Sequence, residues 1–216
     1  MTMKNTIALL SLRHKICLWL LNLFQSIQLV ALCNSRAMGE HSENSDIDLF
    51  IITKKWRLWT GRFLVTVISS LLDIRRRNTH GLSKWSPEYI KKTKDKFCLS
   101  FFITEDAMNL DPIRIENDIY LDKWIQTLVP LVNKNNTLER FQEANSKKIP
   151  SEKGNKQKFR HFIFSIPENI IKHFWLPETL TTYEKLWKPW WVVISDTMLK
   201  FHDNDQREIY RDKHTS

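Results

Sequence analysis

Hydrophobic positions in the first third of the chain change from helical to strand-like spacing. Residues 13–26 carry apolar side chains with the spacing of one helix face, at Ile16, Leu20, Leu23 and Phe24. Residues 28–33 then form a short apolar run that suits a buried strand. Residues 46–53 alternate charged and apolar side chains before becoming wholly apolar, which predicts a second strand.

The next segments repeat this change of spacing. Four apolar residues recur at i, i+3, i+4 and i+7 and predict a helix face: Leu64, Val67, Ile68 and Leu71. The basic residues 75–96 indicate a loop or loosely packed linker. Residues 97–104 are continuously apolar and rich in β-formers, as in a central strand that is covered on both faces.

From Asn117 onward the pattern becomes helical. One broad apolar face, ending near Pro130, is expected from Ile119, Trp124, Leu128 and Leu131. Asn136 followed by Glu139 resembles a capping arrangement, which predicts a further helix through about Asn145. A polar, charged linker follows, and the remainder is rich in tryptophan and ends in a charged tail that we expect to be helical.

This order of elements predicts the α/β (α+β) class, with a small mixed sheet flanked by helices and a helical C-terminal part. We expect the α/β core in residues 1–115 and a helical extension packed on it in 116–145. A linker in 146–158 would lead to a mainly helical, tryptophan-rich segment in 159–216.

Charge and cysteine content narrow the class of protein. The net charge of +9 would attract polyanions such as nucleotides, RNA or an acidic membrane face, although solvated helix ends and loops are the more common explanation of such a charge. Cys17, Cys33 and Cys98 have spacings that suit neither a disulfide framework nor a zinc knuckle, which favours a reduced, cytoplasmic compartment.

Membrane spans are not expected. The apolar stretch 16–33 is interrupted by polar residues, and 63–72 is about half of the roughly 20 apolar residues that a span requires. The N-terminus shows no clear signal-peptide cleavage site.

Two carboxylates stand at the start of the second predicted strand. Alternate residues of a strand share a face, so Asp46 and Asp48 point the same way, with Cα atoms about 6.6 Å apart. That separation allows them to hold a magnesium ion or to bridge two ions. Acids on an otherwise buried strand are costly unless a cation or donors compensate them. The simpler alternative is an aspartate pair that faces solvent.

The loop before these acids is suited to phosphate. Ala37 and Gly39 are small, so that backbone N–H groups and the Ser35 hydroxyl can approach a phosphate closely. Arg36 supplies a further charge or faces water. Such a loop would place a triphosphate beside the acids, which is the geometry that phosphoryl or nucleotidyl transfer needs.

The loop and the acids together resemble the motif G-S-x-A-x-G, a short gap, then S-D-I-D-L, of the DNA polymerase β-like nucleotidyltransferase superfamily. The matching residues are Ser35, Ala37, Gly39, Ser45, Asp46, Ile47, Asp48 and Leu49. Two further segments, at 98–106 and 198–205, resemble uncharacterised bacterial proteins known only as nucleotidyltransferase-domain proteins.

The resemblance implies transfer of a nucleoside monophosphate from a nucleoside triphosphate to an acceptor hydroxyl, with Mg²⁺ or Mn²⁺ held by Asp46 and Asp48. Phosphate would be bound by Asn34, Ser35, Arg36, Gly39 and Ser45. The acceptor stays open among a small molecule, a protein and RNA, as does the oligomeric state.

The sequence departs from the family pattern in two respects. Its first glycine is Asn34 here, and asparagine tolerates the left-handed conformation better than most residues. The family also places a third carboxylate in a neighbouring strand, whereas residues 97–103 contain no acid. We expect Glu105 or Asp106, just beyond that strand, to substitute for it, although both could simply cap the following turn. Without a third acid, a non-catalytic nucleotide-binding or partner-binding module is the alternative.

Other polar and aromatic residues are weaker candidates. His202, Asp203 and Asp205 have the composition of a metal site but fit a helix cap and solvated face better. His41 could touch phosphate or face solvent. Three tryptophans could stack on bases or anchor the segment to the core: Trp187, Trp190 and Trp191.

Overall fold

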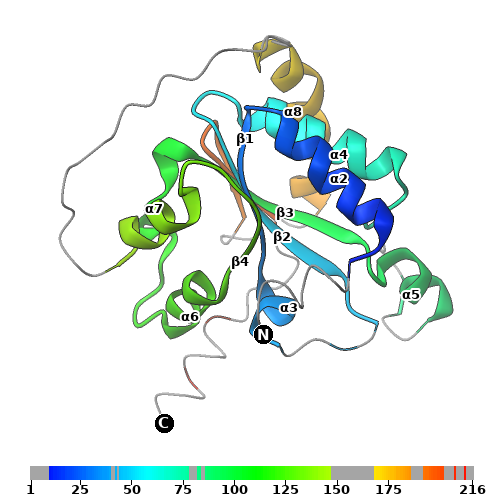
Figure 1. The fold of residues 1–216 in the computed structure, drawn as a ribbon, viewed down its shortest axis with the longest axis horizontal. Helices are drawn as coiled ribbons and strands as arrows, with labels where there is room; N and C mark the ends of the chain where they lie inside the picture. Colours follow the sequence, from blue (N-terminus) through cyan, green and yellow to red (C-terminus); the bar gives the residue numbers. More distant parts are fainter. Residues whose placement is uncertain are drawn as a thin grey trace.

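A six-stranded mixed sheet lies between two layers of helices in the computed structural model of the chain (Figure 1). The structure describes residues 10–39, 42, 44–77, 82–83, 86–146, 168–185, 192–201, 207 and 212. The strands are β1 (Ile27–Leu32), β2 (Ile47–Thr53), β3 (Phe97–Thr104), β4 (Val129–Asn133), β5 (Val193–Ile194) and β6 (Met198–Lys200). Their order is β4-β1-β2-β3-β6-β5, and β2 and β3 run parallel while the other pairs are antiparallel.

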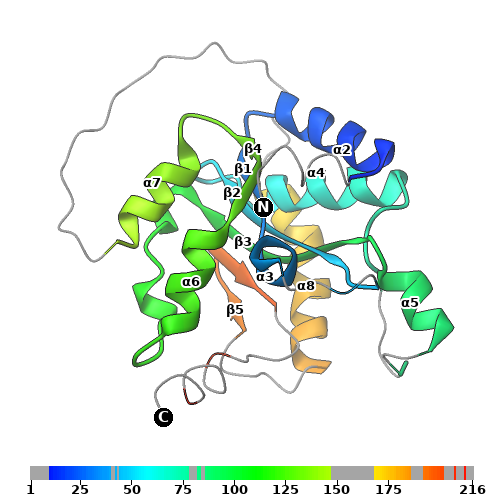
Figure 2. The same ribbon diagram turned by 60° about the horizontal axis from the view of Figure 1, so that its bottom comes forward.

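Helices cover both faces of this sheet. The α-helices are α2 (Leu12–Leu23), α3 (Asn34–Met38), α4 (Leu58–Leu71), α5 (Pro87–Thr93), α6 (Ile119–Thr127), α7 (Thr137–Ala144) and α8 (Glu168–Lys185). Two 3₁₀ turns, η1 (Glu105–Ala107) and η2 (Asp111–Ile113), follow β3. Helices α2, α4 and α8 pack on one face and α6 and α7 on the other. Figure 2 shows α8 beside α4.

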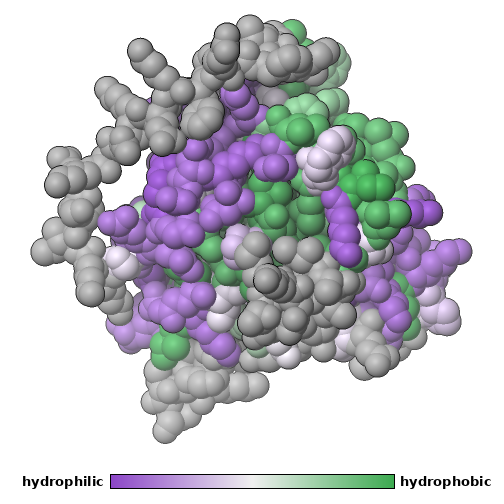
Figure 3. Space-filling view, viewed as in Figure 1, coloured by the Kyte–Doolittle hydropathy of each residue, from purple (hydrophilic) through white to green (hydrophobic). Residues whose placement is uncertain are grey.

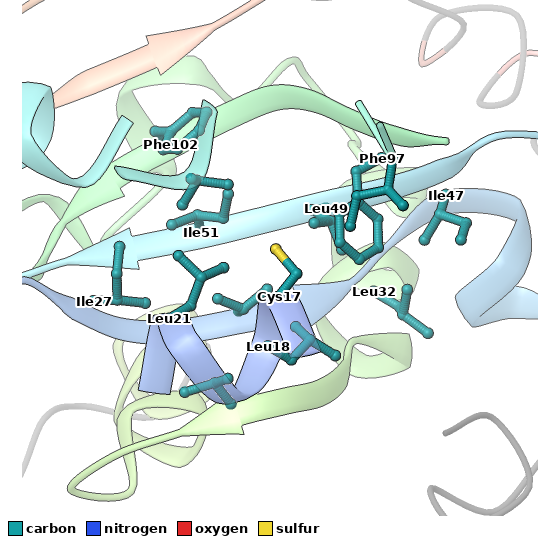
Figure 4. Close-up of a cluster of buried hydrophobic side chains, with 14 of the residues drawn as sticks. Cys17, Leu18, Leu21, Ile27, Leu32, Ile47, Leu49, Ile51, Phe97 and Phe102 are labelled. Atoms are coloured by element: carbon teal, nitrogen blue, oxygen red, sulfur yellow. The ribbon is translucent and has the colours of Figure 1, made fainter. Parts of the chain in front are cut away.

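The first face of the sheet is covered by aliphatic side chains. Cys17 and Leu21 of α2 lie over Ile27 of β1 and Leu49 of β2, and all four are fully buried (Figure 4). Helix α4 approaches β2 closely at Gly61, where a β-carbon would come within 2.3 Å of the Thr53 side chain. Only glycine fits at that contact.

The second face of the sheet carries an aromatic cluster. The ring of Phe50 on β2 lies 5.0 Å, centroid to centroid, from each of three rings: Phe101 of β3, Trp124 of α6 and Phe141 of α7. Because alternate strand residues share a face, Phe50 and Asp48 point to this same side of β2. The site described below therefore stands on a rigid, well-packed base.

The outer surface of α2 is unusually apolar. Leu12, Ile16, Trp19 and Leu23 follow helical spacing and are exposed. They contribute to the hydrophobic region of Figure 3, over the part of the molecule where Figure 1 places α2. Within the described part of the chain, no helix combines the length and apolar character needed to cross a membrane.

The predicted α/β class is confirmed, and the strand predicted at 97–104 has those bounds in the structure. The linker predicted for 75–96 is wrong in part, because α5 forms within it, begun by a Ser86 hydroxyl that accepts from the Tyr89 amide and by Pro87 at its first position. The sequence contains this capping signal, but the loop prediction followed the basic composition of the segment instead.

Strands β4, β5 and β6 were not predicted. β4 lies where we expected a helical face to end, and it contains Pro130, which is tolerated because β4 is an edge strand. β5 and β6 lie in the segment expected to be mainly helical, and their two and three residues are too few to show alternation. The proposed division into domains stays a prediction.

The helix predicted after Asn136 is present as α7, but a residue other than Asn136 caps its N-terminus. Asn136 makes no side-chain cap hydrogen bond and has a left-handed φ of 52°. Asn133 takes this role, since its Oδ1 accepts from the Leu138 amide and its Nδ2 donates to Glu139.

Candidate functional site

The two aspartates and a cysteine meet where β2 and β3 begin. Asp46 directly precedes β2, Asp48 is its second residue, and Cys98 is the second residue of β3 and the register partner of Asp48. One ligand atom from each of these three residues lies within 4.8 Å of the other two. They are the one such group of potential metal ligands within the described residues.

Asp48 is held in a confined polar environment. Burial, and next the negative charge of Asp46, raise the pKa of Asp48 to about 6. The neighbouring side chains of Asn34 and Cys98, together with the charge of Arg76, oppose this rise. The Asp48 carboxylate is thus ionised at neutral pH but easier to protonate than an exposed aspartate.

Arg76 supplies a positive charge to the acid pair. Its Nη1 donates to Asp46 Oδ2 at 2.7 Å and lies 3.8 Å from the Cys98 sulfur. The backbone explains its position: the amide of Arg76 donates to the Phe97 carbonyl, and the Phe97 amide donates to the Ile74 carbonyl. This short pairing runs beside the start of β3 and directs Arg76 towards Asp46.

Arg76 was missed as a site residue because it lay in a presumed linker. The available signal was local, since Ile74 is a buried apolar residue within a run of charges and marks a segment that packs. A cavity of about 370 Å³ adjoins it, lined by Ser70, Asp73, Arg75, Arg76 and Arg77. Of these lining residues, Arg76 is the one whose side chain pairs with Asp46.

Asn34 serves the site as well as the turn. Its φ of 54° is left-handed, so asparagine adopts here the conformation for which the resembled motif has glycine. Its Oδ1 accepts from the indole N–H of Trp124 at 2.9 Å, and the same side chain lowers the pKa of Asp48. A glycine could supply the turn but not this link between α6 and the carboxylate.

Variants of Asn34 separate these two roles. Asn34→Gly keeps the turn and removes the side chain, whereas Asn34→Ala keeps a β-carbon in the left-handed region without the amide that makes asparagine tolerant of it, at a cost of about 1 kcal/mol. We expect both variants to bind metal and nucleotide more weakly, with Asn34→Ala less stable than Asn34→Gly by about that amount. Calorimetry and thermal unfolding measure the two effects, and equal stability of the variants would contradict the conformational role.

Two further residues of the loop, Ser35 and Gly39, belong to α3 and to its end. Ser35 lies half-buried in α3, and Gly39 ends that helix with a φ of 77°, its amide donating to the Ser35 carbonyl. A β-carbon on Gly39 would meet no atom within 4 Å, so its requirement is conformational rather than steric.

The guanidinium of Arg36 binds other groups of this chain, not an open phosphate site. Its guanidinium donates to the carbonyls of Asp46 at 2.9 Å and Ser45 at 2.8 Å, and forms an ion pair of 2.6 Å with Asp95. The Ser45 hydroxyl donates to the Ser42 carbonyl. Both residues therefore fix the backbone that presents Asp46.

Glu105 and Asp106 lie at the opposite end of β3 from Asp48, which corrects the expectation that one of them substitutes for the third acid. In the parallel pair β2–β3, Asp48 lies opposite Cys98, and the strands end at Thr53 and Thr104. Glu105 follows Cys98 by seven positions, about 23 Å along a strand. Glu105 pairs with Arg140 and Asp106 with Lys55.

Several weaker candidates cannot be placed. His41, and the group of His202, Asp203 and Asp205, lie outside the described residues, as do the three tryptophans Trp187, Trp190 and Trp191.

The donor set fits a divalent cation. Carboxylate oxygens from Asp46 and Asp48 are ligands that Mg²⁺ and Mn²⁺ accept. Two neighbouring acids on a mostly buried strand also gain from a cation beyond the single guanidinium of Arg76. The third potential ligand is a sulfur, which Mg²⁺ disfavours.

Comparison with known proteins gives one match. A family model described as a nucleotidyltransferase domain matches residues 19–134, which run from the end of α2 through β4 and include both aspartates and the loop before them. Helix α8 and strands β5 and β6 lie beyond the match. No curated protein and no solved structure matches the chain significantly.

Proposed function

The chain belongs to the nucleotidyltransferase domain family, and from this premise we propose that it transfers a nucleoside monophosphate from a nucleoside triphosphate to an acceptor hydroxyl. The observation that carries the proposal is the convergence of Asp46 and Asp48 beside the loop from Asn34 to Gly39, with the carboxylates supported by donors from separate elements. Two neighbouring, partly buried carboxylates lower the stability of the folded protein, and a bound cation would offset that cost. The arrangement therefore fits a site for a cation and phosphates.

In this proposal Asp46 and Asp48 hold a divalent ion, Mg²⁺ or Mn²⁺. The bound ion supplies charge neutralisation at the phosphates and at the attacking and leaving oxygens. Asp46 has two oxygens, and Arg76 uses Oδ2, so that the carboxylate can face both a guanidinium and an ion. Asn34 orients Asp48, and Arg36 fixes the backbone of Asp46.

The triphosphate would lie against Ser35 and Gly39. The Ser35 hydroxyl would donate to a phosphate oxygen, and the left-handed Gly39 would let the backbone approach without a side chain in between. The arginines around the 370 Å³ cavity provide a positive field that would draw in the polyanion.

The function is tested with two differently labelled nucleotides. Purified protein is incubated with Mg²⁺ or Mn²⁺, a panel of hydroxyl-bearing small molecules, proteins and RNA, and a nucleoside triphosphate labelled at either the α- or the γ-phosphorus. We expect label on the acceptor from the α-labelled nucleotide only, with release of pyrophosphate. Transfer of the γ label would indicate a kinase and contradict the proposal.

A non-catalytic nucleotide-binding module is the second candidate. It is favoured by the position of Arg76, which already neutralises Asp46, and by the lack of a third carboxylate among the described residues near the pair. This candidate predicts nucleotide binding without transfer to any acceptor in the presence of Mg²⁺, Mn²⁺, Co²⁺ or Zn²⁺. Wild-type transfer that is lost in Asp46→Asn excludes it.

Loop variants test the phosphate assignment. Ser35→Ala should weaken triphosphate binding by about 1 kcal/mol or somewhat more, because it removes one hydrogen bond to a charged group. Gly39→Val should weaken it by about 1–3 kcal/mol, because a β-branched residue is strained at the φ of 77°. Calorimetry with the nucleoside alone is the control, and equal losses for nucleoside and triphosphate would show that the loop contacts another part of the ligand.

A further inference from the structure

The neighbour of the aspartate pair on β3 is a thiol. Cys98 is the register partner of Asp48, and its sulfur belongs to the group of ligand atoms that lie within 4.8 Å of one another. The other two cysteines are fully buried, whereas Cys98 is partly accessible. Two carboxylates and one thiolate are sufficient protein ligands for a metal site that keeps a position open for a substrate.

We propose that Cys98 is the third protein ligand of the metal site and that the ion bound there is a thiophilic divalent transition metal of the zinc and cobalt class. The inference rests on the proposed function's assignment of Asp46 and Asp48 as metal ligands, and it replaces the Mg²⁺ or Mn²⁺ named there with a thiophilic ion. Sulfur donors favour zinc and cobalt over magnesium, whereas a site with oxygen donors alone accepts magnesium readily.

The spacing of the three ligand atoms suits a single ion. In a tetrahedral site with bonds of about 2.0–2.3 Å, ligand atoms lie about 3.5 Å apart. The atoms of Asp46, Asp48 and Cys98 lie within 4.8 Å of one another, so side-chain adjustments of about 1 Å would complete the site. All three come from the starts of adjacent strands, which gives the site a rigid support.

Two neighbouring side chains are placed to support a thiolate. The Arg76 guanidinium lies 3.8 Å from the Cys98 sulfur. The Ser100 hydroxyl is buried, does not reach hydrogen-bond geometry with any described residue, and interacts more loosely with this sulfur. A metal-bound thiolate is a good acceptor for such outer donors, which commonly orient metal ligands.

The competing role for Cys98 is that of a neutral thiol. Its sulfur lies within 4.8 Å of an Asp48 carboxylate oxygen, and a thiol S–H can donate to such an oxygen without ever binding a metal. A serine would then replace it well, since a hydroxyl is the stronger donor. A metal ligand, by contrast, loses its sulfur on this substitution.

Titration of the purified full-length protein with Co²⁺ distinguishes the two roles. We expect a thiolate-to-cobalt charge-transfer band in the near ultraviolet that saturates at one equivalent and disappears in Cys98→Ser. Affinity for Co²⁺ should fall about tenfold or more in that variant. Cys17→Ser, a change in the core below α2, is the matched control and should keep the band.

An independent readout uses the wild type alone. Alkylation of Cys98 should slow at least tenfold in the presence of Zn²⁺ and hardly change with Mg²⁺. This measurement keeps the inference testable if Cys98→Ser folds poorly. Cobalt binding without the charge-transfer band, retention of the band in Cys98→Ser, or alkylation that ignores Zn²⁺ would each overturn the inference.

Cys98→Asp separates this inference from the proposed function. It replaces the sulfur with a carboxylate, so we expect its affinity for Mg²⁺ to rise about tenfold or more and the cobalt band to vanish. If wild-type transfer proceeds fully with Mg²⁺ and no thiolate band is found, the proposed function stands and the role of Cys98 fails. If the band is found but nucleotides are neither bound nor transferred, the metal site stands and the proposed function fails.

Discussion

Asp48→Asn is expected to abolish metal-dependent nucleotide transfer while making the folded protein more stable at neutral pH. The loss follows because an amide carries no charge for the ion, whose contribution of several kcal/mol to the transition state corresponds to a fall in kcat/KM on the order of a thousandfold. Nucleotide affinity should also lose its dependence on the metal. Transfer with α-labelled nucleotide and calorimetry measure these two effects.

The gain in stability follows from the raised pKa of Asp48. Burial and the charge of Asp46 raise this pKa from 3.8 to about 6, so the folded state binds a proton more tightly than the unfolded state. The folded state is therefore penalised above pH 6, by at most about 3 kcal/mol. The penalty fades as the pH falls from 6 towards 3.8, and below 3.8 the carboxylate becomes protonated in both states. An asparagine side chain carries no charge at any pH and so avoids this penalty.

The net gain should be about 1–2 kcal/mol, because an amide interacts less favourably than a carboxylate with the neighbouring side chains of Asn34 and Cys98. Thermal unfolding of wild type and variant between pH 4 and pH 8 gives the difference, which should shrink as the pH falls. Asp111→Asn, at an exposed site on η2, should change neither transfer nor this pH dependence. A stabilisation that is independent of pH would contradict the assigned cause.

Glu168→Ala is expected to destabilise the fold by about 2–4 kcal/mol, although this residue lies outside the family match. Helix α4 has no side-chain cap of its own, and the Glu168 carboxylate accepts from the amides of Trp59 at 2.6 Å and Thr60 at 3.0 Å. It also accepts from the Thr60 hydroxyl. Its removal would leave the first amides of α4 without these acceptors in a half-buried environment.

Chemical denaturation of the full chain measures this effect. Glu168→Gln retains one acceptor oxygen without the charge and should fall between wild type and Glu168→Ala. Glu143→Ala, at an exposed position of α7, is the control and should stay within about 0.5 kcal/mol of wild type. If Glu168→Ala were as mild as the control, the contact between α8 and α4 would contribute nothing to stability.

The local parts of the site could be predicted from the sequence. Asp46 and Asp48 share a face because side chains alternate along a strand, whatever that strand pairs with. The left-handed tolerance of Asn34 is likewise a property of the residue, and its φ of 54° agrees with it. These inferences needed no knowledge of neighbouring elements.

The parts that depend on pairing could not be predicted. Whether Cys98 or Glu105 lies beside Asp48 is decided by the parallel direction and register of β2 and β3, which neither strand's composition reveals. Arg76 reaches Asp46 through a short backbone pairing with Phe97, and such isolated pairings leave no periodic pattern. The sequence thus predicted the charges of the site but not the partners that they meet.

Strand β6 pairs with β3 on the side away from β2, and it comes from a segment that follows the family match. A shortened protein that ended where the match ends would expose the edge of β3, where Phe101, Phe102 and Ile103 offer unpaired backbone groups next to large apolar side chains. Such an edge recruits strands from other molecules. A separately supplied peptide containing β6 could instead complete the sheet, which would make the protein a natural candidate for split-reporter design.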